Sequence, residues 1–171
     1  MARVTGDYSP HFLGWNLEIK EFKGKPTVFV ASDGNAIEVT TSEHLRMRNK
    51  PLEQILREVC EEAREYARRI FPRYSYPNGE WYPCGSADIV LRWNEHREII
   101  KLFKKQGEPK GEDWWEGWFG RLFRTRTEGW WWFPKLDRNS QSMRYEEEVC
   151  RFIRDKLAYA NIRVDVRTYI D

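Results

Sequence analysis

The sequence predicts a single α+β domain that spans residues 1–171. Its length suits one domain with a sizeable core. The first forty residues contain short segments of alternating apolar and polar side chains, which is the pattern of half-buried strands. A long stretch at 51–70 instead repeats its apolar residues at helical spacing. Strand and helix patterns continue to residue 170, so we expect one mixed fold rather than two domains.

Residues 12–40 predict a three-stranded antiparallel meander. The alternation is clearest at 12–22, and two further strands are expected at 27–31 and 36–40. The four residues between the last two strands, Ser-Asp-Gly-Asn, tolerate positive φ and favour a hairpin. One face of the first strand carries Leu13, Trp15, Leu17 and Ile19.

The stretch at 51–70 predicts a long amphipathic helix that covers this meander. Pro51 suits its first turn, and Pro72 follows its end. Its apolar stripe consists of Leu52, Ile55, Leu56, Val59, Ala63, Tyr66, Ala67 and Ile70. A stripe of this width needs another element to cover it, and the meander is the nearest candidate.

Four further elements are expected in the second half of the chain. Strands are predicted at 87–93 and 162–170, and we expect both to extend the sheet of the N-terminal meander. A short helix is predicted at 94–106. A longer helix begins near Ser142 and closes at Asn161.

The segment 113–135 holds six of the nine tryptophans. Its first half, 113–124, has apolar residues at the spacing of one helical face, with Trp115, Trp118 and Leu122 along the centre of that face. We therefore expect a helix in which these three side chains are largely buried. A β-hairpin across 121–133 is the competing interpretation, because Thr127-Glu128-Gly129 has the composition of a turn.

Three consecutive tryptophans follow in the same segment. In a strand, Trp131 points to the face opposite Trp130 and Trp132. At least one of these rings is therefore expected to stay accessible at an edge, a groove or a partner contact.

Tryptophan rings beside arginine and lysine side chains are typical of surfaces that bind single-stranded nucleic acid, because bases stack on rings and cations hold phosphates. This pattern predicts a nucleic-acid-associated binding protein that contacts single-stranded DNA or RNA, without catalysis or a cofactor. Additional basic residues at 68, 69 and 73 support this interpretation. The expected binding residues are Arg121, Arg124, Arg126, Trp130, Trp131, Trp132, Lys135 and Arg138.

A protein-interaction module, either a complex subunit or an inhibitor of another protein, is the alternative function. The formal net charge is only +2, so attraction to nucleic acid would depend on local patches. Tryptophan and arginine are also enriched at protein-interface hot spots. A tryptophan patch flanked by Glu112, Glu116 and Glu128 would favour a protein partner, whereas one ringed by arginine would favour nucleic acid.

A second alternative comes from the order of the expected elements: three strands, a helix, a strand, a helix, then a later helix and strand. This order resembles the ribonuclease H-like core. The resemblance implies a metal-dependent nuclease with two metal ions held by carboxylates from the first strand, the first helix and the fourth strand. The corresponding positions are Glu18 or Asn16, Glu58 or Glu62, and Asp88. The sequence contains no other metal-ligand cluster and no nucleophile or phosphate-loop motif.

The sequence also predicts a cytoplasmic, soluble chain. No segment approaches the roughly 20 apolar residues that cross a bilayer, and the first residues lack the apolar run of a secretory signal. Cys60, Cys84 and Cys150 are widely spaced and odd in number, which favours free thiols in a reducing compartment.

Overall fold

The computed structural model describes residues 50–75, 84–138, 140 and 142–170 with their side chains. It also gives the backbone of four strands in residues 2–39. The helices are α2 (Leu52–Ile70), the 3-10 turn η1 (Phe71–Tyr74), α3 (Arg97–Gln106) and α4 (Met143–Tyr159). The strands with described side chains are β5 (Gly85–Arg92), β6 (Gly107–Gly111), β7 (Trp114–Gly117), β8 (Gly120–Arg124), β9 (Gly129–Pro134) and β10 (Asp165–Ile170).

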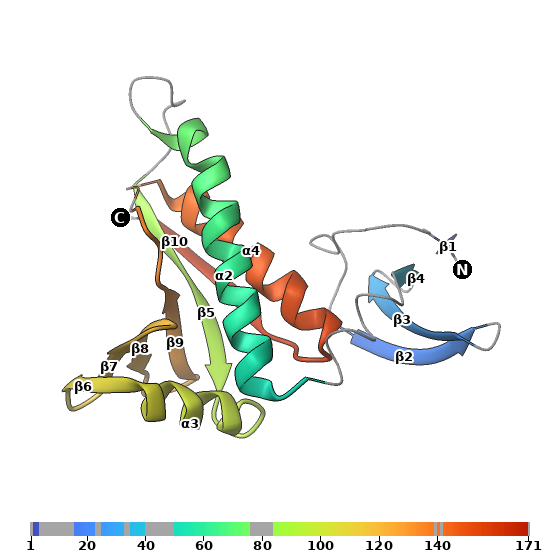
Figure 1. Ribbon diagram of the computed structural model, residues 1–171, viewed down its shortest axis with the longest axis horizontal. Coiled ribbons are helices and arrows are strands. Elements are labelled where there is room, and N and C mark those ends of the chain that lie inside the picture. The colour runs from blue at the N-terminus through green and yellow to red at the C-terminus, as the bar shows by residue number, and fades with distance from the viewer. Residues whose placement is uncertain are drawn as a thin grey trace.

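These six strands form one antiparallel sheet in the order β10-β5-β9-β8-β7-β6 (Figure 1). Strands β6 to β9 are a meander, β9 pairs with β5, and α4 connects β9 to β10 on the far side of β5. The predicted α+β class is thereby confirmed. The helices expected at 51–70, 94–106 and 142–161 and the strands expected at 87–93 and 162–170 are also present, with ends shifted by up to three residues.

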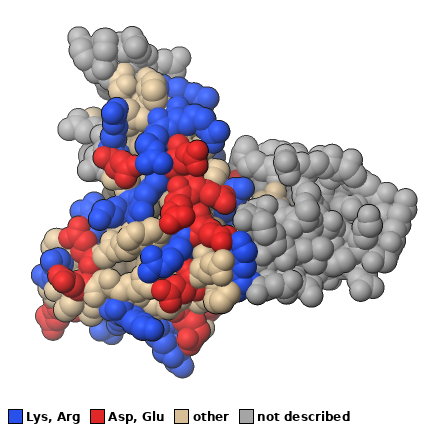
Figure 2. All heavy atoms as spheres, in the orientation of Figure 1, with Lys and Arg blue, Asp and Glu red and all other residues tan. Residues whose placement is uncertain are grey.

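The three helices lie on one side of this sheet, which we call the helix face. Helices α2 and α4 pack side by side in front of β5 and β10 (Figure 1). Tyr66 of α2 stacks on Phe152 of α4 with ring centroids 4.6 Å apart. Phe103 of α3 contacts the rings of Phe119 and Trp132, at 5.1 and 5.0 Å. Acidic and basic side chains are interspersed over the outside of this helix layer (Figure 2).

The core lies between the helices and the helix face. Alternate residues of β5, Ala87, Ile89 and Leu91, are buried against the helices and belong to the main hydrophobic cluster. Val90 points the other way and is not part of that cluster. None of the described helices packs on that second side of the sheet, which we call the open face.

The helix predicted over 113–124 is wrong, because these residues form β7, a tight turn and β8. Trp115 lies opposite Leu122 on the paired strand, so both point to the helix face. Gly120, just after the turn, has φ of 126°, and a Cβ there would lie 2.1 Å from the carbonyl oxygen of Phe133. A helix cannot contain that conformation. The competing hairpin is confirmed, since β8 pairs with β9.

The burial expected for the first half of the tryptophan segment is only partly correct. Leu122 is fully buried, but Trp115 and Trp118 are half-buried. Trp118 sits at the turn beside α2, where the guanidinium groups of Arg57 and Arg64 lie 5.0 and 4.2 Å from its ring. Arg64 also donates to the backbone carbonyls of Trp118 and Lys135. These contacts attach the β7–β8 turn to α2.

A second sheet comprises β1 (Ala2–Arg3), β2 (Asn16–Phe22), β3 (Lys25–Ser32) and β4 (Asn35–Val39), in the order β1-β4-β3-β2. The expectation that β5 and β10 extend this sheet is wrong, because both belong to the six-stranded sheet. The ribonuclease H-like arrangement required them to share it. The predicted cover of the N-terminal strands by α2 depends on side chains outside the described residues and stays a prediction.

Within the described part of the chain, no helix has both the length and the apolar character that crossing a membrane requires.

Candidate interaction surface

The open face carries a row of aromatic side chains that come from four strands, β7, β8, β9 and β10. Alternation along β9 directs Trp131 and Phe133 to this face, while Trp130 and Trp132 point into the core. The pairing of β8 with β9 sets Phe123 opposite Trp131. We call the whole row, which is half-buried throughout, the aromatic ribbon; its members are Trp114, Phe123, Trp131, Phe133 and Tyr169.

Direct ring contacts hold one half of the aromatic ribbon together. Trp114 stacks on Phe123, with centroids 5.3 Å apart and planes at 16°. Phe123 meets Phe133 edge to face at 5.6 Å. The guanidinium of Arg121 lies 5.7 Å from the Phe133 ring. Such pairs each add about 0.5–1.5 kcal/mol beyond their buried area, so these rings form a fixed surface rather than independent side chains.

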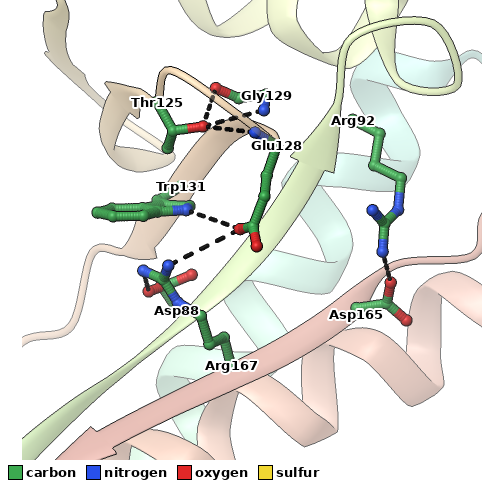
Figure 3. Close-up of polar contacts among 8 residues, drawn as sticks. All are labelled: Asp88, Arg92, Thr125, Glu128, Gly129, Trp131, Asp165 and Arg167. Carbon is green, nitrogen blue, oxygen red and sulfur yellow. Dashed lines mark hydrogen bonds and ion pairs between the residues drawn. The ribbon is translucent and has the colours of Figure 1, made fainter.

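Arg167 of β10 connects the other half of the ribbon to an acidic cluster (Figure 3). Its guanidinium carbon lies 3.5 Å from the centroid of Trp131 and 5.2 Å from that of Tyr169. It donates to Asp88 Oδ2 at 2.7 Å and lies 3.8 Å from Glu128 Oε2. Trp131 Nε1 donates to the same Glu128 oxygen at 3.4 Å. The positive charge of Arg167 is therefore balanced within the chain.

Asp88 is fully buried beneath this cluster. Burial raises the pKa of its carboxyl above the ordinary value of 3.8, and the Arg167 guanidinium opposes that rise. Asp88 Oδ1, Arg167 Nε and Trp114 Nε1 are buried atoms with no hydrogen-bond partner among the described residues. Burying a polar atom without a hydrogen-bond partner costs free energy. This face therefore has hydrogen-bond donors and an acceptor that the described residues do not satisfy.

The β8–β9 turn positions Glu128. Thr125 Oγ1 accepts from the backbone N–H groups of Glu128 and Gly129, at 3.1 and 3.0 Å, and donates to the Gly129 carbonyl at 3.0 Å. Gly129 has φ of 131°, and a Cβ there would lie 2.2 Å from the carbonyl oxygen of Leu91. Glycine is therefore needed for β9 to begin beside β5. This geometry directs Glu128 toward Arg167 and Trp131 (Figure 3).

The charges of the open face are mixed and more often acidic than basic. Its carboxylates are Asp88, Glu108, Glu116, Glu128 and Asp165, and its cations are Arg92, Arg121, Arg167 and Lys110, which pairs with Glu108 at 3.3 Å. Arg92 is paired with Asp165 across the two neighbouring strands (Figure 3). Since Arg167 is also paired, the surface offers few cations to an incoming phosphate.

The residues predicted to bind nucleic acid are not gathered on one surface. Trp130 and Trp132 are core residues, which corrects their assignment as contact residues: strand alternation turns both inward. Trp132 Nε1 donates to the Phe119 carbonyl at 2.9 Å, and Lys104 lies 4.5 Å from the Trp130 ring. Only Trp131 and Arg121 of the predicted set share the open face. The remaining members lie at strand ends and in loops and are Arg124, Arg126, Lys135 and Arg138.

The carboxylates expected for a metal-dependent nuclease do not meet. Asp88 lies under the open face, whereas Glu62 of α2 is 3.5 Å from Lys156 of α4 in the helix layer on the other side of the sheet. The side chain of Glu18 lies outside the described residues. In the part of the chain that the structure describes, no group of three or more histidine, cysteine, aspartate or glutamate side chains could hold a metal ion.

A cavity of about 720 Å³ lies beside the start of α3 and the loop before β10. Its one buried titratable side chain, His96, accepts from the Arg92 N–H at Nδ1 (2.8 Å) and contacts the Arg163 carbonyl through Nε2 (2.7 Å). The neutral ring therefore donates at Nε2, and both nitrogens are engaged. His96 therefore connects the end of β5 to the loop before β10.

No protein-family model, curated protein sequence or solved structure matches this chain.

Arg167 and Tyr169 were not among the residues predicted to bind a partner, although the alternation of the last strand indicates their position. The alternation in β10 places Val166 and Thr168 on the helix face, which leaves Arg167 and Tyr169 on the other. The partners of Arg167 could not be predicted from the sequence, because they are far away along the chain. Asp88 of β5 lies 79 residues earlier, and Glu128 of the β8–β9 turn lies 39 residues earlier.

Proposed function

We propose that the chain is a protein-interaction module that binds a partner protein through the open face of its six-stranded sheet. The observation that carries this proposal is the aromatic ribbon, a set of five half-buried rings on a sheet face that none of the described helices covers. Tryptophan and tyrosine supply much of the binding energy at protein interfaces, because they bury large area at low entropic cost.

The charges of this face favour a protein over nucleic acid. Arg167 and Arg92 are both paired with carboxylates of the same face. Glu128 and Glu116 flank the rings. Among the described cations of this face, Arg121 is the one with no carboxylate within ion-pair distance in the described part of the chain. A phosphate backbone would meet more negative than positive charge here, and its binding depends on cations. A protein surface can complement mixed charges.

The test compares captured proteins among three matched forms of the full chain. The double variant Trp131→Ser, Phe133→Ser removes two rings of the aromatic ribbon from β9 on the open face. Lys101→Ser on α3 is the control, because its exposed side chain lies on the helix side. Each form is immobilised and exposed to extract from cells that naturally make the chain, with and without nuclease treatment, and bound proteins are quantified.

We expect the wild type and Lys101→Ser to capture one or more proteins in equal amounts. The double variant should capture at least about ten-fold less of the same proteins, because a ten-fold loss of affinity is typical when a hot-spot residue is removed. Nuclease treatment should leave that capture unchanged. Equal capture by all three forms would contradict the proposal, and so would capture that nuclease abolishes.

We keep nucleic-acid binding as a second proposal, because a different surface carries arginine side chains beside aromatic rings. This surface lies at the end of α2 and in η1. Arg68 pairs with Asp137 at 2.5 Å, Arg69 lies 5.5 Å from the Tyr66 ring, and Arg73 is exposed. Arg138 lies over Phe71 in the same region. Basic side chains gather around this end of the helix layer (Figure 2). Rings beside guanidinium groups suit stacked bases and phosphates.

This second proposal predicts binding of labelled single-stranded DNA or RNA that weakens steeply with salt. Replacing Arg69 and Arg73 by serine should reduce both the affinity at low salt and its dependence on salt concentration. The open-face double variant should bind as the wild type does. An affinity that is unmeasurable at low salt, or one that the arginine substitutions leave unchanged, rules this candidate out.

We also infer that the chain works in a reducing compartment. Cys60, Cys84 and Cys150 are free thiols. Burial raises the pKa of Cys60 to about 12, and burial likewise raises the pKa of Cys150. Both buried thiols are therefore protonated and packed as apolar groups.

A further inference from the structure

We propose that two copies of this chain associate through the outer edge of β10, which joins their six-stranded sheets into one continuous sheet. The inference goes beyond the proposed function, because it concerns the edge of the sheet rather than the aromatic ribbon, and the occupant is a second copy of the chain.

The two edges of the sheet are built differently. At the β6 edge, Pro109 lacks a backbone N–H, and the pairing with β7 shifts register between Pro109 and Gly111. The exposed side chains of Glu108 and Lys110 are charged. Proline, a bulge and charge are the devices that keep an edge strand from pairing with another chain. The β6 edge is therefore protected.

The β10 edge has neither proline nor a bulge, and its two charged residues, Asp165 and Arg167, are paired with Arg92 and Asp88 of the neighbouring strand β5. All six of its residues are in continuous register with β5, without proline, glycine or a bulge. Among the strands that the structure describes, none other than β5 pairs with β10, so its outer side has no strand partner in that part of the chain. Thr168 is exposed, and Ile170 is 66% exposed, the most exposed large hydrophobic residue in the described part of the chain. A regular strand with free backbone groups and an exposed apolar side chain is a template for strand addition.

The sequence of β10 complements itself when it pairs antiparallel with a second copy. A continuous sheet with the helices of both copies on one side requires opposed residues to come from the same face. Two such registers pair five residues of each strand. One of them sets Arg167 against Arg167 of the other copy, and like charges directly opposite are unfavourable.

The other five-residue register is favourable at every position. Thr168 faces its own counterpart on the two-fold axis, and threonine pairs stabilise adjacent strands. Val166 faces Ile170 of the other copy, which covers the exposed isoleucine. Arg167 faces Tyr169 of the other copy and extends between copies the cation–π contact that it makes at 5.2 Å within one chain. The structure therefore assigns this register to the dimer.

The register makes a specific test possible, because position 168 meets itself. Thr168→Lys and Thr168→Glu each place two like charges across the axis, whereas an equal mixture of the two variants places opposite charges there. Thr127→Lys, in the exposed β8–β9 turn, is the control for the added charge. Sedimentation velocity of the full chain measures mass over a range of concentrations.

We expect the wild type and Thr127→Lys to approach twice the 20.7 kDa mass of one chain as concentration rises. Each Thr168 variant alone should dissociate at least about ten-fold more readily, and the mixture should recover dimer. A wild-type chain that is monomeric at every concentration overturns the proposal. A dimer that both Thr168 variants leave intact, or a mixture that fails to recover, also overturns it.

Hydrogen exchange of the wild type provides a readout that needs no variant. Amide protons in 165–170 that point away from β5 should exchange more slowly at high than at low protein concentration, while those of 107–111 should not change. Protection that is independent of concentration at both edges contradicts the dimer.

Discussion

Replacing Trp132 by alanine is expected to lower the free energy of unfolding by about 3–5 kcal/mol, the usual range for emptying a large buried aromatic site. Trp132 is fully buried, contacts the ring of Phe103 at 5.0 Å and donates its Nε1 proton to the Phe119 carbonyl. The substitution therefore leaves a cavity and removes the Trp132 hydrogen bond from the Phe119 carbonyl, which keeps the Lys135 N–H as a donor. Equilibrium unfolding in urea measures the loss.

Trp131→Ala is the matched control, because it removes the same side chain from the adjacent position of the same strand. Trp131 is half-buried on the open face, so we expect a loss of about 1 kcal/mol. Similar losses for the two variants would contradict the assignment of Trp132 to the core and Trp131 to the surface.

The second large effect is expected for Arg167→Met at neutral pH. Methionine keeps an unbranched apolar side chain over Trp131 but removes the charge that pairs with fully buried Asp88. Removal of one partner of a buried ion pair costs about 3–5 kcal/mol, because the other charge is left uncompensated. Since the Arg167 side chain is 28% exposed, we expect a value of about 3 kcal/mol.

The cost of Arg167→Met should depend on pH in a defined direction. Burial raises the pKa of Asp88 in the folded protein. The contribution of the protonated Asp88 carboxyl to folding stability is therefore fully present below about pH 3.8, and it is lost as pH rises through the pKa of the folded state. Removing Arg167 takes away the group that opposes this rise. The variant should therefore lose more stability relative to wild type at pH 7 than at pH 4. Urea unfolding at the two pH values gives the comparison.

Asp88→Asn provides the control for this pair, because it removes the buried charge and keeps the size of the side chain. In the Asp88→Asn background, Arg167→Met should cost less than in the wild type, and the cost should depend less on pH between 4 and 7, because only the more exposed Glu128 contact of Arg167 remains. A cost that is the same at both pH values in the wild-type background would show that Arg167 acts only by packing.

The sequence predicted those elements whose pattern is local and continuous. The apolar stripe at 51–70 became α2 because one helical face carries it, and the strand alternation near 87–93 and 162–170 became β5 and β10. Residues 113–124 were predicted incorrectly for a physical reason. Trp115 and Leu122 share a face because two strands fold back on each other, and a hairpin with a two-residue turn reproduced the spacing of a helix. Gly117 and Gly120, on either side of that turn, were the available signal.

The candidate site was less predictable than the fold. Strand alternation predicted that Trp130 and Trp131 point to opposite faces, and this is confirmed: Trp130 is buried in the core and Trp131 lies on the open face. The cluster around Arg167 did not follow, because its members lie on β5, β10 and the β8–β9 turn and meet only through the order of strands in the sheet. The abundance of arginine beside tryptophan favoured nucleic acid, yet Arg57, Arg64 and Arg167 make their cation–π contacts within the fold.

The most direct measurement of the central claim, that the open face binds a protein, is site-specific photocrosslinking. A photoreactive phenylalanine analogue replaces Phe123, in the centre of the aromatic ribbon, or Phe152, which is also half-buried but lies in the helix layer. Both forms of the full chain are irradiated in cells that naturally make it, and crosslinked products are identified by mass spectrometry. We expect a crosslink from position 123 to a partner protein that position 152 does not form. Crosslinks from position 123 to nucleic acid, or the same protein products from both positions, would contradict it.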